Sequence, residues 1–330
     1  MPASDKPSLK QVLFPVEERP IFQIAQTPRQ ADLFTQGTAA QFEQIPRFKA
    51  IVDAESGHVF AVVVDSYALV PNAIAIDLGK QCFATIFGAD AADSMELFNV
   101  VMPRKRSFCH VDFVYRQGAV GPDPRDLWLP FLRITNSYNR TRPLRFDLGF
   151  CRGICKNGMV FGGQTISYRY LHTYESMARS AEFRTSFVRW GDLSAAFLET
   201  LHNLKRYFVP RALIFPLVCH AFGIRFGATD LAKKRRGQQL REMYAQITEL
   251  ADHYCGELGE NGYAALNVLT DFASRPLGYF SPDAVIDSLQ KKSGEWIDAF
   301  PAAIKANSFD WDRYLDGYIA QARLMEEAGT

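Results

Sequence analysis

The sequence of 330 residues is poor in cysteine and has no long apolar run. Its six cysteines are too few for the disulfide framework of a small secreted protein, so we expect reduced, mostly buried thiols. No stretch approaches the roughly 18 consecutive apolar residues of a membrane-spanning helix. The opening residues, MPASDKPSLK, lack the apolar core of a signal peptide. These absences predict a cytoplasmic protein without a membrane partner.

Common cofactor motifs are missing as well. The chain contains neither GxxxxGK[ST] nor GxGxxG, which excludes the usual glycine-rich phosphate loops. Hydrophobic residues make up 48% and charged residues 22%, as in folded globular proteins, so global disorder is excluded. The sequence therefore offers no catalytic residue and no cofactor, and it favours a non-enzymatic role.

Charge is balanced overall but distributed unevenly. The net charge is +1. Residues 1–100 carry 7 basic and 12 acidic side chains (−5), residues 101–189 carry 15 and 6 (+9), and residues 190–330 carry 15 and 18 (−3). Of the 15 basic residues in the middle segment, 13 are arginine, whose planar guanidinium suits phosphates and base stacking. The middle segment is therefore the candidate binding region.

Periodicity divides the chain into three parts. Residues 1–40 are polar and contain several prolines, so we expect an N-terminal arm with little structure of its own. Residues 41–190 form the α+β core with the basic face, which begins with a hairpin around Glu55-Ser56-Gly57 and a helix over 73–87. Residues 191–330 form a helical region, with helices expected over 192–208, 229–258, 260–273, 282–300 and 310–327. The fold class is α+β: an antiparallel β-meander with packed helices, followed by a mainly helical C-terminal region.

The basic residues of the core fall on expected strands and turns. Strands are predicted over 97–102, 107–115, 129–135 and 144–151, with a loop over 118–126 and a further hairpin at Lys156-Asn157-Gly158. Aromatic residues are interleaved with arginines, as in proteins that track a strand's phosphates and stack its bases. The predicted interface consists of Arg104, Lys105, Arg106, Arg133, Tyr138, Arg140, Arg142, Arg145, Phe150, Arg152 and Lys156. Two other interpretations stay open: a solvated face with internal ion pairs, and a surface for an acidic protein.

Cysteine and histidine offer an alternative chemistry. Cys151, Cys155 and His172 are of the residue types that bind zinc, and Cys109-His110 is the one candidate for a further ligand. Structural zinc sites, however, usually have four ligands at short spacing. The same residue types also allow a nucleophile, Cys155 or Cys109, next to a histidine base. Buried thiols beside a turn are the simpler interpretation, so no metal is predicted.

Two segments resemble a known family. ITNSYNRTRPLRFDLGFCRGICKNGMVFG contains an Asn136-Ser137-Tyr138 turn, a strand, and an Arg152…Cys155-x-Asn-Gly-Met159 segment. FKAIVDAESGHVFAVVVDSYALVPNAIAI is similar to the opening hairpin of the same family, and His172-Thr173 resembles its strand-to-helix junction. The family is the phage/plasmid-like domain of unknown function 932 (DUF932), and the resemblance covers roughly residues 45–205.

The resemblance implies a mobile-element context, because members of this family are typically found on phages, plasmids and integrated elements. A weaker analogy links the basic β-meander to single-strand annealing proteins of the RecT/Red-beta kind. We therefore expect a non-enzymatic protein that binds nucleic acid, preferably single-stranded DNA, and forms a homo-oligomer; the context implies recombination, replication, or defence and counter-defence. A defence or counter-defence protein that docks an acidic partner, and an unrecognised Cys/His enzyme, are the alternatives.

Overall fold

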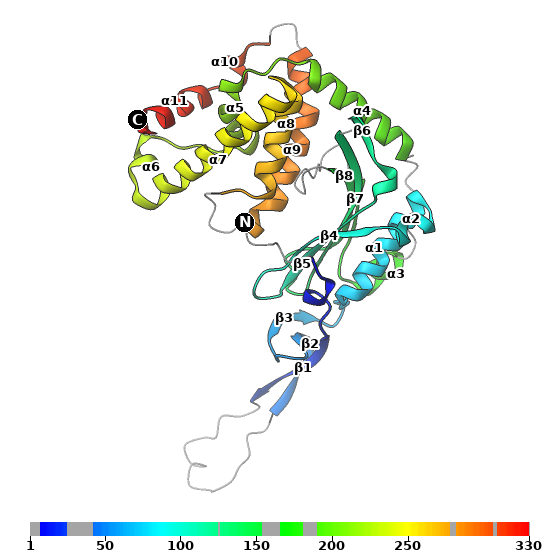
Figure 1. The fold of residues 1–330 in the computed structure, drawn as a ribbon. Helices are drawn as coiled ribbons and strands as arrows, with labels where there is room; N and C mark the ends of the chain where they lie inside the picture. Colours follow the sequence, from blue (N-terminus) through cyan, green and yellow to red (C-terminus); the bar gives the residue numbers. More distant parts are fainter. Residues whose placement is uncertain are drawn as a thin grey trace.

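A computed structural model describes residues 7–24, 42–124, 126–153, 166–180, 190–277, 282–305 and 309–329 (Figure 1). Two antiparallel sheets come first along the chain, and helices make up most of the remainder. In Figure 1 the smaller sheet lies at the bottom, the larger sheet in the middle and the helical region at the top. The α+β class and its division into a sheet-rich N-terminal part and a helical C-terminal part are confirmed.

The smaller sheet has the order β1 (Val16–Ile24), β2 (Phe42–Asp53) and β3 (Val59–Val64). The predicted β2–β3 hairpin turns at Gly57, whose φ of 72° favours glycine. Residues 16–24 were expected to have little structure, but they pair with β2 from Val16↔Asp53 onward. Pairing satisfies backbone groups that would otherwise remain open along the edge of β2.

The larger sheet has the order β4-β5-β7-β8-β9, and β6 pairs beside β7. Strands β4, β5, β7 and β8 match the four predicted strands within about three residues, whereas β6 occupies part of the predicted loop and β9 was not predicted. The hairpin at Lys156-Asn157-Gly158 lies outside the described residues. The bounds are β4 (Glu96–Val101), β5 (Phe108–Val114), β6 (Val120–Asp123), β7 (Asp126–Ser137), β8 (Leu144–Arg152) and β9 (Ile166–Tyr170).

Helix α1 (Asn72–Phe87) covers one face of the larger sheet, with α2 (Ala89–Asp93) beside it (Figure 1). Phe83 of α1 lies in the same buried cluster as Ile134 of β7 and Phe146 of β8. At Gly79 a Cβ atom would lie 2.5 Å from the Ile134 Cδ1 atom, so glycine permits this close approach of helix and strand.

The C-terminal region is helical, as predicted, but two expected helices are interrupted. Extended backbone at Lys233 separates α6 from α7, and Gly317, with a φ of 76°, lies between α10 and α11. Helix α4 begins two residues before the predicted start, so Asp192 lies in its first turn. The helices are α3 (Tyr174–Ser180), α4 (Trp190–Arg206), α5 (Ile214–Phe222), α6 (Ala228–Ala232), α7 (Lys234–Leu258), α8 (Gly262–Ser274), α9 (Pro282–Lys305), α10 (Trp311–Tyr314) and α11 (Tyr318–Gly329). No helix in the described part of the chain is both long and apolar enough to cross a lipid bilayer.

The far end of the larger sheet is built into the helical core. The ring of Phe150 stacks on Phe197 of α4 with 4.1 Å between centroids, and both belong to the cluster around the buried helix α8. The indole N–H of Trp128 donates to the Tyr263 hydroxyl at 2.9 Å. Sheet and helices therefore share one core at this end.

Two buried arginines add polar ties between the sheet and the helices. Arg133 pairs with Asp112 of the neighbouring strand (2.7 Å) and donates to the side-chain oxygen of Gln290 on α9 (2.7 Å). Arg152 pairs with Asp126 (2.7 Å), and Asp126 also accepts from the Tyr263 hydroxyl (2.7 Å). A buried charge is costly unless it is paired, so these networks have to form together with the core.

We predict that Arg133→Gln strongly destabilises the protein, because it leaves the Asp112 carboxylate buried without its ion-pair partner. The expected loss in the free energy of unfolding is about 3–5 kcal/mol, measured from urea unfolding followed by circular dichroism. Arg323→Gln, a change at an exposed arginine of α11, is the matched control and should stay within about 0.5 kcal/mol. Equal stability of the two variants would contradict a structural role for Arg133.

Candidate nucleic-acid interface

The turn between β7 and β8 is fixed by the Asn-Ser-Tyr segment. The Asn136 side chain donates to the Asn72 side-chain oxygen at 2.8 Å, and the Tyr138 hydroxyl accepts from the Asn72 backbone N–H at 3.0 Å. Ser137 closes the turn, since its hydroxyl donates to the Arg142 carbonyl (2.6 Å) and accepts from the Arg142 N–H (3.1 Å). These buried contacts hold the turn that presents Arg140 and Arg142.

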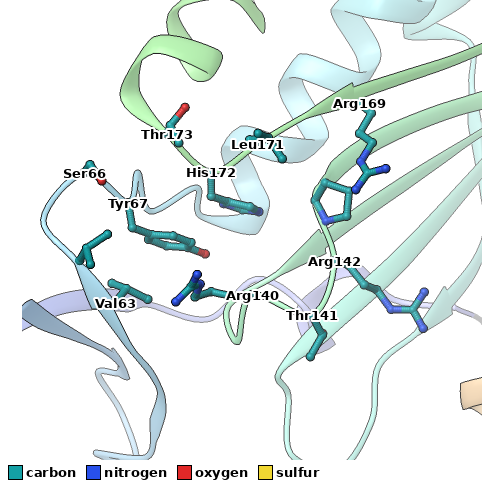
Figure 2. Close-up of a pocket in the computed structure, with 12 residues that line it drawn as sticks. Val63, Ser66, Tyr67, Arg140, Thr141, Arg142, Arg169, Leu171, His172 and Thr173 are labelled. Carbon is teal, nitrogen blue, oxygen red and sulfur yellow. The ribbon is translucent and has the colours of Figure 1, made fainter.

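A pocket of about 330 Å³ lies next to this turn, between the two sheets (Figure 2). Its walls come from the end of β3 with Tyr67, from residues 140–143 of the turn, and from residues 169–173 at the β9–α3 junction. Three of the lining residues are arginines, and none of the described residues that line it is acidic. We call this site the arginine pocket: Arg140, Arg142 and Arg169 around Tyr67 and His172.

The three guanidinium groups are held differently. Figure 2 shows Arg140 beside the hydroxyl end of Tyr67, and Arg169 extending from β9 towards the turn. The Arg142 guanidinium lies 4.5 Å from the centroid of the Phe108 ring, which places it on the outer side of the pocket. Arg140 and Arg169 are exposed and form no hydrogen bond or ion pair with the described residues. Their charges are therefore available to an anion.

Tyr67 and His172 form a rigid, uncharged wall. Their rings are stacked with 5.1 Å between centroids and 7° between planes. The Tyr67 hydroxyl donates to the Ser137 carbonyl (3.2 Å), and burial raises the pKa of Tyr67 to about 12. His172 Nδ1–H donates to the Ala68 carbonyl (3.3 Å), and burial lowers the pKa of His172 below its ordinary value. Near neutral pH the charge of the pocket is therefore that of its arginines.

The turn between β4 and β5 lies at the same end of the sheet, because Phe108 at the start of β5 pairs with Ser137 at the end of β7. Arg104 and Lys105 of this turn are exposed. Arg106 is already engaged, with its guanidinium 3.6 Å from the Phe14 ring centroid and 2.9 Å from an Asp53 carboxylate oxygen. Arg104 and Lys105 therefore extend the positive surface of the pocket, whereas Arg106 stabilises the fold.

Four residues of the predicted interface are buried, and for them the prediction of contact with nucleic acid is wrong. Arg133 and Arg152 form ion pairs inside the protein, with Asp112 and Asp126. Tyr138 supports the turn from within, and Phe150 packs on α4, so neither ring is open to a base. As whole residues, these four are at most 3% exposed. Arg145 is 28% exposed and pairs with Asp147 at 2.7 Å. Lys156 lies outside the described residues.

Of the predicted interface, Arg140 and Arg142 line the pocket, together with residues that the sequence analysis did not select. Arg169 is isolated in the sequence, but it is the register partner of Arg145 on the neighbouring strand. Tyr67 meets His172 because an isolated bridge joins Tyr67 to Thr173. His172-Thr173 was noted as a strand-to-helix junction, which was the one available signal for this contact.

Cys151 and His172, which were considered as zinc ligands, do not come together in the structure. In the β8–β9 register Leu144 faces Tyr170, so His172 lies near the start of β8 while Cys151 lies seven residues further along the strand. At about 3.3 Å per residue the two residues are about 23 Å apart. Among the described residues no group of three or more His, Cys, Asp or Glu side chains is placed to hold a metal. Cys155 lies outside the described residues.

The described thiols are also poorly suited to nucleophilic chemistry. Cys109 is 2% exposed, and burial raises its pKa to about 12. Burial likewise raises the pKa of Cys151 far above its ordinary value. His110 follows Cys109 on a strand, so their side chains point to opposite faces of the sheet. A thiolate, the reactive form, is strongly disfavoured at both cysteines near neutral pH.

We predict that Cys109 and Cys151 resist alkylation in the folded protein, while Cys255, which is half-buried, is modified before either of them. Burial both blocks the reagent and suppresses the thiolate. The measurement is iodoacetamide labelling at neutral pH followed by peptide mass spectrometry, with urea-unfolded protein as the control in which all three react. Native labelling of Cys109 at the rate of an unfolded thiol would contradict the buried assignment.

A comparison with known protein families supports the resemblance found in the sequence. The profile of the domain of unknown function DUF932 matches residues 59–278, more than half of the chain. The match reaches α8, well beyond the roughly 45–205 that the resemblance was expected to cover. No curated protein and no solved structure matches. With its β7–β8 turn held by Asn136-Ser137-Tyr138 inside the matched segment, the chain belongs to the DUF932 family.

Proposed function

We propose that this protein binds single-stranded nucleic acid, with DNA as the preferred form, through sequence-independent phosphate contacts in the arginine pocket. The observation that carries the proposal is the composition of the pocket: three arginines and no carboxylate among its described lining residues. Neither the Tyr67–His172 wall nor an acidic neighbour within the lining offsets this charge. The pocket is therefore a place where an anion gains electrostatic energy.

A phosphodiester matches the geometry of this pocket. Guanidinium groups donate paired N–H bonds that fit phosphate oxygens, and Arg140 and Arg169 have their donors uncommitted among the described residues. A pocket of about 330 Å³ lies at the small end of the size range of ligand sites. It accommodates one phosphate and its sugar, while the neighbouring nucleotides continue over the rim.

Further positive charge lies beside the pocket, on the turn between β4 and β5. Arg104 and Lys105 are exposed on the adjacent turn, at the same end of the sheet as Arg140. A single strand is flexible, so its successive phosphates can each reach one of these separated charges. Proteins that bind single strands commonly use such a track of positive charge. This arrangement favours a single strand over a stiff duplex.

The wider role follows from the family resemblance. We propose a cytoplasmic protein of a phage- or plasmid-like element that protects or handles single strands during recombination. Annealing of complementary strands by a homo-oligomer, in the manner of RecT or Red-beta proteins, stays a prediction. Several weak sites on one assembly would reinforce one another through effective concentration.

We predict that the triple substitution Arg140→Gln, Arg142→Gln and Arg169→Gln weakens binding of a labelled oligothymidine and flattens its salt dependence. Each phosphate contact contributes about −0.7 to the log–log slope of affinity against salt, so losing three contacts reduces the slope by about 2. The measurement is fluorescence anisotropy between about 50 and 200 mM salt, the range in which such contacts weaken most visibly.

The matched control removes three exposed arginines from the helical region: Arg241→Gln, Arg313→Gln and Arg323→Gln. It changes the net charge equally but leaves the pocket intact, so its salt slope should equal that of the wild type. Equal effects of the two triple variants would show a general charge effect and contradict the pocket. Absence of binding even at low salt would remove the proposed function and favour the acidic-protein partner.

A further inference from the structure

Three large apolar side chains are exposed at or beside the arginine pocket: Val64, which is 44% exposed and lines it, Leu171, and Tyr174, which directly follows the lining residue Thr173. Leu171 is 59% exposed and lines the pocket, and Tyr174, at the start of α3, is 60% exposed. Thr173, between them, also lines the pocket. Exposed apolar side chains are ordinary when scattered, but here an aromatic ring and a leucine adjoin a cationic site. They are the exposed apolar surface that a strand in the pocket would meet next.

The ring of Tyr174 is held in place from one side. Lys49 donates to the Tyr174 hydroxyl at 3.2 Å, and its Nζ atom lies 5.4 Å from the ring centroid. Lys49 also pairs with Glu18 at 2.9 Å and donates to the Asp65 carbonyl at 3.2 Å. The lysine thus fixes the hydroxyl end of the ring, and its charge is balanced by Glu18. A ring held in this way loses little conformational entropy when a ligand packs on it.

We propose that Tyr174 is a stacking platform for a base of the strand whose phosphate occupies the arginine pocket. This inference rests on the proposed function. It adds a contact with the base, whereas the arginine pocket contacts the phosphate. Every base has an apolar π-face, so stacking on a tyrosine is tolerant of sequence. Leu171 adds exposed apolar surface to the lining of the pocket.

This placement explains how single strands and duplexes are told apart. In a duplex the bases are stacked on each other and are not free to lie on a protein ring, whereas an unpaired base is. Tyr174 takes the role that the sequence analysis assigned to Tyr138 and Phe150, which are buried. Exposure next to the pocket, which only the folded chain reveals, is what distinguishes Tyr174 from them.

The test compares two labelled single strands of equal length, one of thymidines and one of abasic tetrahydrofuran units, which keeps the phosphates and removes the bases. Tyr174→Ala should weaken binding of the thymidine strand about tenfold and leave binding of the abasic strand unchanged. Tyr174→Phe, which keeps the ring and removes the hydroxyl contact with Lys49, should bind the thymidine strand within about twofold of the wild type.

A second readout uses a 2-aminopurine base, whose fluorescence is quenched when it stacks. The wild type and Tyr174→Phe should quench it, and Tyr174→Ala should not. Equal losses on both strands, or no loss on either, would overturn the stacking role while leaving phosphate binding intact. Equal affinity of the wild type for the two strands would do the same. Failure of the wild type to bind either strand would overturn both proposals.

Discussion

The buried pairs Arg133–Asp112 and Arg152–Asp126 govern how the rest of the molecule is arranged. Each joins two strands of the larger sheet and then reaches a helix, Arg133 through Gln290 on α9 and Arg152 through the Tyr263 hydroxyl that shares Asp126. Because charges in a low-dielectric interior need their partners, sheet and helical region must close together over these groups. The pairs also remove two arginines from the surface of the most basic segment of the chain.

The two ends of the larger sheet consequently differ: one is packed into the apolar core, and the other carries exposed positive charge. At one end aromatic side chains such as Trp128 and Phe150 enter the helical core. At the other end the strands finish in turns against the smaller sheet, and the exposed Arg140 and Arg169 line the pocket there. The Asn136-Ser137-Tyr138 segment belongs to this second end, where its hydrogen bonds shape a turn. Its contribution to the proposed binding is therefore indirect, through the position of Arg140 and Arg142.

Local patterns predicted the elements well, because hairpin turns and helical periodicity are properties of neighbouring residues. The helix over 73–87 and the hairpin at Glu55-Ser56-Gly57 are found as expected. The site was only half predictable. Burial of Arg133 depends on Gln290, 157 residues away in the sequence, and the Tyr67–His172 stack depends on pairing between distant segments. Arg169 stands alone in the sequence, so no local pattern marks it. An arginine-rich stretch of sequence shows where positive charge is concentrated. Only the fold shows which of these arginines already form ion pairs inside the protein.

The central claim is that the turn of β7–β8 and the β9–α3 junction together receive a single strand. Hydrogen–deuterium exchange with and without an oligothymidine tests it most directly, because it locates the contact without altering the protein. We expect slower exchange in peptides that cover residues 138–143 and 166–174, with the helices α7 to α11 unchanged. Protection confined to the helical region, or no protection at a concentration that saturates binding, would contradict the claim.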